Sequence, residues 1–471
     1  MAQRQKKVQK KEPKKVEKKV RKETMSEEKF TTDYREIADK TGRGEALTVI
    51  VRTKAKSIAE EDAKRALDLL QAEQMATRRA QLLARVYERY GNGAEFAKNL
   101  QDSRLTAQAK VVQAAPKAAH LWLADAVAVT GTKAEIEELA KHEDIESVDA
   151  NPTFRMPEIL RTPLEDTPQV IDGSAWGVAK IQAPEVWGGF GRGQGILVGH
   201  LDTGVDGTHP ALAGKVAAFQ EFDALGLPVV SAVHDSHVHG THTAGTICGR
   251  NFRGINIGVA PDARLASALV LPGGGGTFAQ IVAGMQWAIS QNVQVISMSL
   301  GGQGYTILWN IPVLNATLAG VLVVASIGNS GHGTSGGPGN DLFSVGVGAT
   351  HYQDAVAGFS GGQTLVQVLH ATLGFLTYMK PDLSAPGVQV LSAIPGPELA
   401  AFNGTSMAAP HVAGSVALVL SAAAGLLGNP LAVRSILLGT IEDYGEAGRD
   451  QRYGFGRLDA LAAVQTAVSI V

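Results

Sequence analysis

Three segments of the chain carry residue types suited to nucleophilic acyl transfer. Asp202 ends the apolar run Ile196–Asp202, His239 opens a His-Gly-Thr-His segment, and Ser406 follows a Gly-Thr pair at the start of a long apolar stretch. A serine hydroxyl becomes an effective nucleophile when an imidazole takes its proton, and that imidazole needs a carboxylate to orient it. These residues therefore predict a serine nucleophile, a histidine base and an orienting aspartate.

Acyl transfer also needs donors for the negative charge that develops on the carbonyl oxygen. A helix that begins near Ser406 would present free backbone N–H groups and the positive end of its dipole at this point. A second donor is required, and Asn329 follows the apolar segment Val321–Ile327. Its side-chain amide is the candidate for that role.

The elements that must position these residues are short apolar strands that alternate with helices beyond Trp176. The expected strands are Ile196–Asp202, Leu265–Leu271, Val293–Leu300, Val321–Ile327 and Leu342–Val347, and helices are expected to begin near His239, Thr277, Ile311 and Thr405. This alternation predicts an α/β fold with a mostly parallel sheet and helices on both faces. Ligands bind such sheets at the carboxyl ends of the strands, where Asp202 and Asn329 stand.

The motifs around these positions resemble those of the subtilases, the subtilisin-like serine peptidases. The matching segments, between about Trp176 and the C-terminus, include Asp202-Thr-Gly-Val-Asp, His239-Gly-Thr-His-Thr-Ala-Gly, Ser299-Leu-Gly-Gly, Gly328-Asn329 and Gly404-Thr-Ser-Met-Ala-Ala-Pro-His-Val-Ala-Gly. The order Asp, His, Ser is also that of subtilisin. The implied roles are orienting acid for Asp202, general base for His239, nucleophile for Ser406, oxyanion donor for Asn329 and a structural role for His242.

The resemblance further implies a cleft in which an extended substrate pairs its backbone with two edges of the enzyme. The residues that would flank the substrate are Ser299, Leu300, Gly301 and Gly302 on one edge and Gly274 and Gly275 on the other. Small, apolar walls, with Gly336 near the pocket floor, favour an apolar residue before the scissile bond. The expected partners are protein or peptide substrates, and the enzyme is expected to be a monomer.

The implied chemistry requires no cofactor, but the resemblance allows a structural calcium ion. Calcium prefers oxygen ligands, and Asp172 and Asn251 are the candidate ligands. Ala211 and Phe252 stand where relatives carry oxygen ligands. The presence of a bound calcium ion is therefore an open alternative at this point.

The N-terminal third differs from the rest of the chain in glycine content and in charge. Only five of the 54 glycines precede residue 161, and residues 1–24 hold nine lysines and two arginines against three glutamates. We expect a solvated, disordered tail over residues 1–44 that solubilises the chain. A nucleic-acid contact is the alternative for this tail, since clustered cations release counterions, but no specific nucleic-acid partner is expected.

Residues 45–155 predict a small α+β unit with a helical insert at 57–100. The segments that begin at Leu121 and Asp144 resemble a subtilase pro-domain. This resemblance implies an intramolecular chaperone and inhibitor, removed by self-cleavage between about residues 151 and 172. A linker or processing region is expected at 156–175 and the peptidase domain at 176–471, in which the long segment 361–378 has no assigned purpose.

Apolar runs bear on the compartment and on membrane contact, whereas the cysteine content leaves the redox compartment open. No apolar stretch follows the basic run, so no standard secretory signal is expected. A cytoplasmic location is favoured, with secretion by another route as the alternative. The single cysteine, Cys248, excludes an intrachain disulfide. The run Ala408–Val433 is long enough to cross a bilayer, but its glycines and prolines favour a helix buried in a soluble domain.

Other classes of function are less well supported by the motifs. A histidine cluster compatible with zinc comprises His237, His239 and His242 with Asp235. A paired His-Glu-x-x-His motif is absent from the sequence, so a metallohydrolase is disfavoured. The glycine runs at 273–276 and 189–195 lack the features of a phosphate-binding loop. A catalytically inactive binding protein remains the alternative, because a fold alone does not establish activity.

Overall fold

The computed structural model describes residues 28–42, 44–53, 92–115, 117–156, 168–370 and 374–471. The chain divides into two compact units, a smaller one of Met1–Ser57 with Gln101–Pro152 and a larger one of Ile58–Leu100 with Thr153–Val471. Most of the helical insert expected at 57–100, and the central part of the linker expected at 156–175, lie outside the described residues.

The smaller unit is built on a four-stranded antiparallel sheet. Its elements are α2 (Thr32–Lys40), β1 (Ala46–Thr53), the part of α5 (Gly93–Ala114) from residue 101 onward, β2 (Lys117–Leu121), β3 (Ala126–Thr132), α6 (Lys133–Ala140) and β4 (Ile145–Ala150). The strand order is β2-β3-β1-β4. Alternate residues of β1 and β3 are buried in one core together with one face of α6, because alternate residues of a strand share a face of the sheet. These elements make the α+β unit that the sequence predicts.

Order in the smaller unit begins earlier than the lysine-rich composition suggests. Thr31 caps α2, because its side chain accepts a hydrogen bond from the Tyr34 N–H. Tyr34 and Ala38 are buried in the core of this unit. The disorder expected over 1–44 is therefore wrong for residues 28–42, which have a core against which to bury apolar surface. The lysine run at 1–24 lies outside the described residues.

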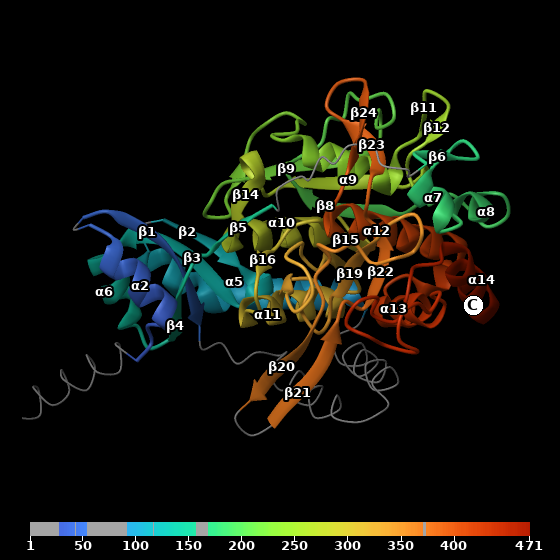
Figure 1. The fold of residues 1–471 in the computed structure, drawn as a ribbon. Coiled ribbons are helices and arrows are strands. Elements are labelled where there is room, and N and C mark those ends of the chain that lie inside the picture. The colour runs from blue at the N-terminus through green and yellow to red at the C-terminus, as the bar shows by residue number, and fades with distance from the viewer. Residues whose placement is uncertain (1–27, 43, 54–91, 116, 157–167, 371–373) are drawn as a thin grey trace, which may run out of the picture. The chain divides into compact units, whose positions relative to one another are not determined.

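The larger unit contains an eight-stranded sheet (Figure 1). Its strands are β8 (Leu197–Asp202), β9 (Val216–Phe222), β10 (Pro228–Val229), β13 (Arg264–Leu269), β15 (Val295–Met298), β17 (Leu322–Ser326), β19 (Val345–Thr350) and β22 (Leu383–Pro386). The order is β10-β9-β13-β8-β15-β17-β19-β22, and every neighbouring pair except β10 and β9 is parallel. The predicted mostly parallel sheet is confirmed.

Helices cover both faces of this sheet, and β8 shows how. Gly199 and Leu201 face α10 (Phe278–Ser290). The intervening His200 and the terminal Asp202 are hydrogen-bonded to α9 (Val238–Cys248). Successive residues of a strand point to opposite faces, so α9 and α10 lie on opposite sides. Helix α12 (Thr405–Ala422) contacts α9 and the strands β8, β15, β17, β19 and β22, while α11 (Asn310–Leu318) contacts α10 and β17.

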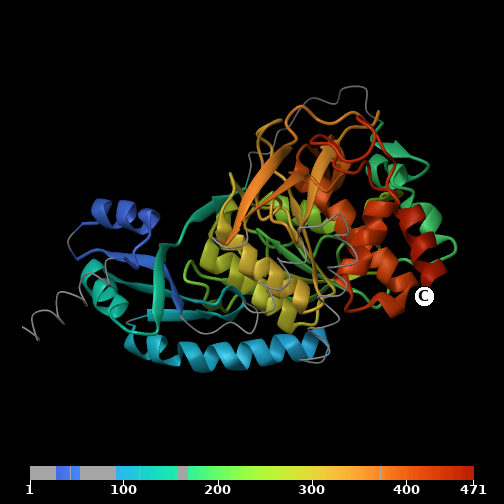
Figure 2. The same ribbon diagram turned by 90° about the horizontal axis from the view of Figure 1, so that it is seen from below.

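The remaining elements of the larger unit are short pieces around this core. They are β5 (Thr153–Arg155), β6 (Val170–Ile171), β7 (Ser174–Ala175), α7 (Trp176–Lys180), α8 (Ala183–Trp187), β11 (Asn251–Phe252), β12 (Ile255–Asn256), β14 (Gly275–Thr277), β16 (Gly302–Gln303), β18 (Gly336–Gly337), β20 (Gln363–His370), β21 (Gly374–Lys380), β23 (Val390–Ile394), β24 (Glu398–Phe402), α13 (Pro430–Gly439) and α14 (Ala460–Ile470). Strands β20 and β21 form an antiparallel hairpin that accounts for the long segment 361–378 (Figure 1). Figure 2 shows α13 and α14 side by side at the C-terminal end of the chain.

Helix α12 contains most of the long apolar run that follows Ser406. It is long and apolar enough to cross a membrane, yet 89% of its 18-residue window is buried inside the protein. It contacts β15, β17, β19 and β22 along one side and α9 and α14 elsewhere. A helix enclosed in this way needs apolar residues all round. The expected buried core helix is confirmed.

Candidate active site

Asp202 and His239 meet where β8 ends and α9 begins. His239 Nδ1 lies 2.7 Å from Asp202 Oδ1, and the Thr203 N–H donates to the same oxygen at 2.8 Å. The two segments approach closely because residue 240 is glycine. A Cβ on Gly240 would lie 2.0 Å from the Gly204 carbonyl oxygen. Only a residue without a side chain permits this contact.

A second aspartate, Asp235, is hydrogen-bonded to both the residue after β8 and the first turn of α9. Asp235 Oδ1 accepts from Thr203 Oγ1 at 2.7 Å. Asp235 Oδ2 accepts from the Thr241 N–H at 2.7 Å and from the Thr241 hydroxyl at 2.6 Å. Both oxygens of Asp235 are thus engaged by protein donors. This aspartate secures the position of the strand end relative to the helix.

Ser406 is brought to this site by β15, the strand next to β8. Met298, the last residue of β15, pairs with Leu201, so Ser299 follows at the level of Asp202. The Ser299 hydroxyl donates to the Ser406 carbonyl at 2.7 Å, and the Ser406 hydroxyl lies 3.4 Å from the Ser299 carbonyl. Ser406 is the second residue of α12. Its N–H is among the first four of the helix, which have no partner within it.

Asn329 is oriented by the start of the same helix. Its Oδ1 accepts from the Thr405 N–H at 2.9 Å and from the Thr405 hydroxyl at 2.7 Å. An amide whose oxygen is held in this way must direct its NH₂ group elsewhere. A Cβ on Gly404 would lie 3.2 Å from Asn329 Nδ2. The amide donor therefore lies beside the residues that precede Ser406.

His239 and Ser406 are not hydrogen-bonded to each other in this conformation. His239 Nε2 is buried and has no hydrogen-bond partner in the part of the chain that the structure describes. The Ser406 hydroxyl is instead directed to the Ser299 carbonyl. Catalytic hydrogen bonds are often long without substrate and tighten when it binds.

Burial and charge act in opposite directions on the acid of this site. Burial would raise the pKa of Asp202, but the charge and hydrogen bond of His239 outweigh it and hold the pKa below its usual value. For His242, burial lowers the pKa to about 3. His242 Nε2 lies 3.0 Å from the Val390 carbonyl, to which it donates. Asp202 is therefore ionised and His242 neutral at neutral pH.

A segment of the chain itself lies along the cleft edge within the larger unit. Strand β5 pairs with β14 in antiparallel register, with Arg155 opposite Gly275. The Met156 N–H donates to the Gly274 carbonyl at 2.9 Å. These are the backbone contacts expected for an extended substrate on this edge. The glycine run at 273–276 thus pairs with an extended backbone segment of the same chain.

A cavity of about 340 Å³ opens beside this segment. Its lining residues are Arg155, Leu300, Gly301, Gly302, Gln303, Ser326, Gly328, Asn329, Ser330, Thr334, Ser335 and Gly336. The expected pocket residues Leu300, Gly301, Gly302 and Gly336 are therefore brought together with Asn329. Ser299 is buried against Ser406, whereas Gly274 and Gly275 contact the chain's own segment.

Phe154 packs in an aromatic cluster that no sequence motif indicates. Its ring centroid lies 5.1 Å from that of Trp309, which in turn lies 5.1 Å from Phe278. A Cβ on Gly302 would come within 2.6 Å of the Phe154 ring. Such aromatic contacts contribute beyond the area that they bury. The aromatic cluster combines residues from β5, from α10 and from the segment before α11. No local sequence pattern connects these three segments.

The residues considered for metals do not assemble a metal site. Among the described residues, no group of three or more His, Cys, Asp or Glu side chains could hold an ion. His237 Nδ1 accepts from the His239 N–H, and His239 and His242 have the partners given above. Asn251 donates its amide to Asn256 Oδ1 at 3.0 Å. Asp172 and Asn251 therefore do not provide the several carboxylate oxygens that calcium prefers.

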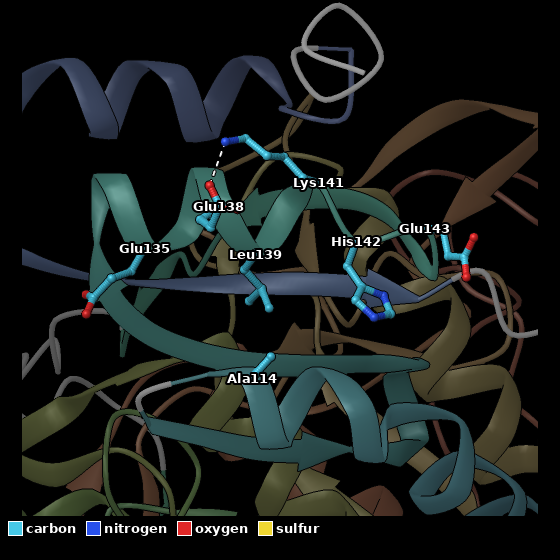
Figure 3. A pocket seen from close by; sticks show the side chains of 7 residues that line it. All are labelled: Ala114, Glu135, Glu138, Leu139, Lys141, His142 and Glu143. Atoms are coloured by element: carbon cyan, nitrogen blue, oxygen red, sulfur yellow. Dashed lines mark hydrogen bonds and ion pairs between the residues drawn. The ribbon is translucent and has the colours of Figure 1, made fainter. Parts of the chain in front are cut away.

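A larger cavity, of about 670 Å³, lies in the smaller unit (Figure 3). It is lined by Ala114, Glu135, Glu138, Leu139, Lys141, His142 and Glu143. Glu135 caps the start of α6, and Lys141 pairs with Glu138 at 2.6 Å. His142 accepts from the Asp144 N–H. These polar groups stabilise the ends of a helix, so we assign the chemistry to the site around Asp202.

Comparison with known proteins agrees with this geometry. The model described as the Subtilase family matches residues 193–456. The chain belongs to the subtilase family. This subtilase is 38% identical over 251 residues to the intracellular serine protease of Paenibacillus polymyxa, covering 52% of this chain and 72% of that protein. It is 36% identical over 268 residues to the major intracellular serine protease of Bacillus subtilis strain 168, covering 56% and 81%. It is 36% identical over 296 residues to subtilisin Savinase of Lederbergia lenta, covering 62% and 98%.

The family membership establishes a subtilisin-like serine endopeptidase that acts on protein substrates. Chemistry of this kind needs no cofactor. Two features of the site lay beyond the sequence motifs. One is the aromatic cluster around Phe154, and the other is a set of buried polar side chains behind Asp202 that includes His200. A histidine inside an otherwise apolar strand was a signal that could have pointed to the second.

Proposed function

We propose that this subtilase cleaves peptide bonds through Asp202, His239 and Ser406, and that it is made as a self-processing zymogen. The observation that carries the proposal is the pairing of β5 with β14, together with the 2.7 Å contact between His239 and Asp202. A segment of the chain already lies where a substrate backbone would lie. Asn329 lines the cavity beside this segment.

In the proposed reaction, Ser406 Oγ attacks the carbonyl carbon while His239 Nε2 takes its proton. Asp202 holds the Nδ1–H of the imidazole and stabilises the imidazolium. The Asn329 amide and the Ser406 N–H donate to the oxyanion of the tetrahedral intermediate. Collapse breaks the peptide bond, and the imidazolium gives its proton to the leaving amine. Water then attacks the acyl-enzyme by the same steps in reverse order.

Residues 45–155 serve in this proposal as intramolecular chaperone and inhibitor. Thr153–Arg155 occupies the cleft edge that a substrate would use, so the uncleaved segment competes with substrate. Residues that precede a scissile bond form the paired strand in this binding mode. We therefore place the processing bond after Met156 and before about residue 172. Residues 157–167 of that interval lie outside the described structure.

The test is the fate of the full-length chain in two serine variants. Ser406→Ala is expected to accumulate as a precursor that neither hydrolyses casein nor reacts with a fluorophosphonate probe. Ser415→Ala is the matched control, since Ser415 lies in the same helix and its hydroxyl donates to the His411 carbonyl at 2.9 Å. Intact mass and N-terminal sequencing report the processing bond. Normal maturation of purified Ser406→Ala alone would contradict self-processing.

We further propose that the residue before the scissile bond is apolar. Leu300 and four glycines line the cavity together with Arg155 and uncharged polar side chains, and no acidic side chain is among its described lining residues. A lysine or arginine in this cavity would therefore lose water without gaining a counter-charge. Profiling with a peptide library tests this preference, and dominant cleavage after arginine or lysine would refute it.

A cytoplasmic, monomeric enzyme is the corresponding proposal for location and assembly. Two of the relatives are named intracellular serine proteases, which supports this location. Cell fractionation with an antibody against the larger unit would test it. Sedimentation of the Ser406→Ala chain would test the monomer, and a concentration-independent dimer would contradict it.

A further inference from the structure

A layer of buried polar side chains lies directly behind the catalytic pair. His200 and Asp202 are two residues apart on β8 and so share one face of the sheet. His239 and Thr243 are four residues apart on α9 and share one face of the helix. The pair His200 and Thr243 therefore lies one layer below the pair Asp202 and His239. Ser267 of β13 is the direct strand partner of His200.

These side chains form a continuous chain of hydrogen bonds that ends on Asp202. Ser267 Oγ lies 3.0 Å from His200 Nδ1, and His200 Nε2 lies 2.9 Å from Thr243 Oγ1. Thr243 Oγ1 donates to Asp202 Oδ2 at 3.1 Å. His200, Thr243 and Ser267 are each at most 1% exposed. Polar groups placed so deep are costly to bury unless their hydrogen bonds are satisfied.

The number of available protons determines which group donates and which accepts in each of these hydrogen bonds. The Thr243 hydroxyl has one proton and contacts two pure acceptors, Asp202 Oδ2 and the Gly240 carbonyl at 3.1 Å. Whichever acceptor takes that proton, His200 Nε2 must be the donor to Thr243 Oγ1. The Ser267 hydroxyl then donates to His200 Nδ1. With the ionised carboxylate as the stronger acceptor, all three donors are directed toward Asp202.

This direction requires a neutral His200. Its pKa is lowered by burial, against the raising effects of Asp202 and Asp235 and with a further lowering by His239. His200 Nε2 lies 4.0 Å from Asp202 Oδ2, which is too long for a direct hydrogen bond. His200 therefore contacts the catalytic acid through the Thr243 hydroxyl.

We propose that His200 is a positioning residue of the catalytic acid, acting through Thr243 on Asp202 Oδ2. Asp202 Oδ1 is held by His239 and by the Thr203 N–H, whereas Thr243 is the hydrogen-bond donor that the described structure gives to Oδ2. Two anchored oxygens prevent rotation of the carboxylate away from the imidazole. The inference rests on the proposed role of Asp202 in the reaction.

The experiment expresses the full-length chain and four variants, lets each mature, and assays the matured enzyme on a peptide anilide, with active sites counted by a fluorophosphonate. Thr243→Val keeps the shape and removes the hydroxyl, and His200→Leu removes both ring nitrogens. Thr243→Val is expected to lower kcat about 10-fold, since a hydrogen bond to the charged Asp202 is lost. His200→Leu is expected to lower kcat by less, since the Thr243 hydroxyl remains but loses the donor that orients it. KM should change less than about two-fold in both variants. His200→Gln, which retains an amide donor, should restore most of the activity. Ser267→Ala, which removes the hydrogen-bond donor farthest from Asp202, should change kcat least.

A double variant tests whether His200 acts through Thr243. Adding His200→Leu to Thr243→Val should lower kcat little further, because the connection is already broken. The acid limb of kcat/KM should move to higher pH in Thr243→Val, since a carboxylate that has lost a donor stabilises the imidazolium more strongly. Additive losses, or unchanged kcat and pH profile with a lower unfolding free energy, would overturn the inference and leave a structural role.

Asp202→Asn separates this inference from the function on which it rests. It is expected to lower kcat about 10⁴-fold, as loss of the orienting acid does in other serine peptidases. Full activity of Asp202→Asn would refute the proposed function itself. An inactive Asp202→Asn with unaffected Thr243→Val and His200→Leu would refute only the positioning role.

Discussion

Acid should destabilise the larger unit through His411, a buried histidine of α12. Burial lowers its pKa to about 4, from an ordinary value of 6.5, and its Nδ1 lies 2.8 Å from the Met407 carbonyl. Between these two pH values the unfolded chain binds a proton that the folded chain does not. Stability from this residue is therefore full above pH ~6.5 and is lost as pH falls toward ~4.

The magnitude follows from the two pKa values. At 1.36 kcal/mol per pKa unit, lowering the pH from ~7.5 to ~4.5 should remove about 2.5 kcal/mol from His411 alone. Other groups titrate in the same interval. Burial raises the pKa of Asp341 to about 6, which acts in the opposite direction because the folded state then binds the extra proton. The pH dependence of the total unfolding free energy therefore does not report on His411 alone. Only the difference in unfolding free energy between variants isolates this residue.

The assay is urea unfolding of Ser406→Ala, which cannot digest itself, with and without His411→Gln. Tryptophan fluorescence reports mainly the larger unit, which holds four of the five tryptophans, namely Trp176, Trp187, Trp287 and Trp309. The stability difference between the two chains should shrink by about 2.5 kcal/mol from pH ~7.5 to ~4.5. Ser415→Ala, which removes a hydroxyl and no titrating group, should give a difference independent of pH. A pH-independent difference for His411→Gln would refute the reasoning.

Three further predictions concern catalysis, the core and processing. Asn329→Ala should lower kcat about 10²- to 10³-fold with little change in KM, a magnitude known from a subtilisin and not worked out from this chain. Unchanged kcat would remove Asn329 from the oxyanion site. Asp382→Asn should lower the unfolding free energy in urea by about 3–5 kcal/mol, because it leaves buried cations unpaired. Those cations are Lys380 at 2.6 Å, Arg434 at 2.7 Å and Arg449 at 3.1 Å from the carboxylate. Gly302→Ala should slow maturation followed by intact mass, since its Cβ would meet the Phe154 ring, and maturation at the normal rate would argue against docking of that segment.

Much of the fold could be predicted because its signals are local. Apolar runs marked the central strands, and the capping residue Thr277 marked the start of α10 within one residue. Composition alone misjudged residues 28–42, because lysine content says nothing of Tyr34, whose burial depends on strands more than 80 residues away. The long segment 361–378 was visible as an insertion, but its hairpin pairing depends on register between two strands.

The sequence by itself determined the chemistry of this subtilase. The residues proposed as nucleophile, base, acid and oxyanion donor stand in motifs whose residue types the reaction demands, so the motifs alone were enough to propose Asp202, His239, Ser406 and Asn329. Only the tertiary structure decided what surrounds them. The docking of Phe154 near Trp309 and the chain from Ser267 to Asp202 join segments far apart in sequence. Such contacts depend on strand register and helix phase, which local patterns do not specify.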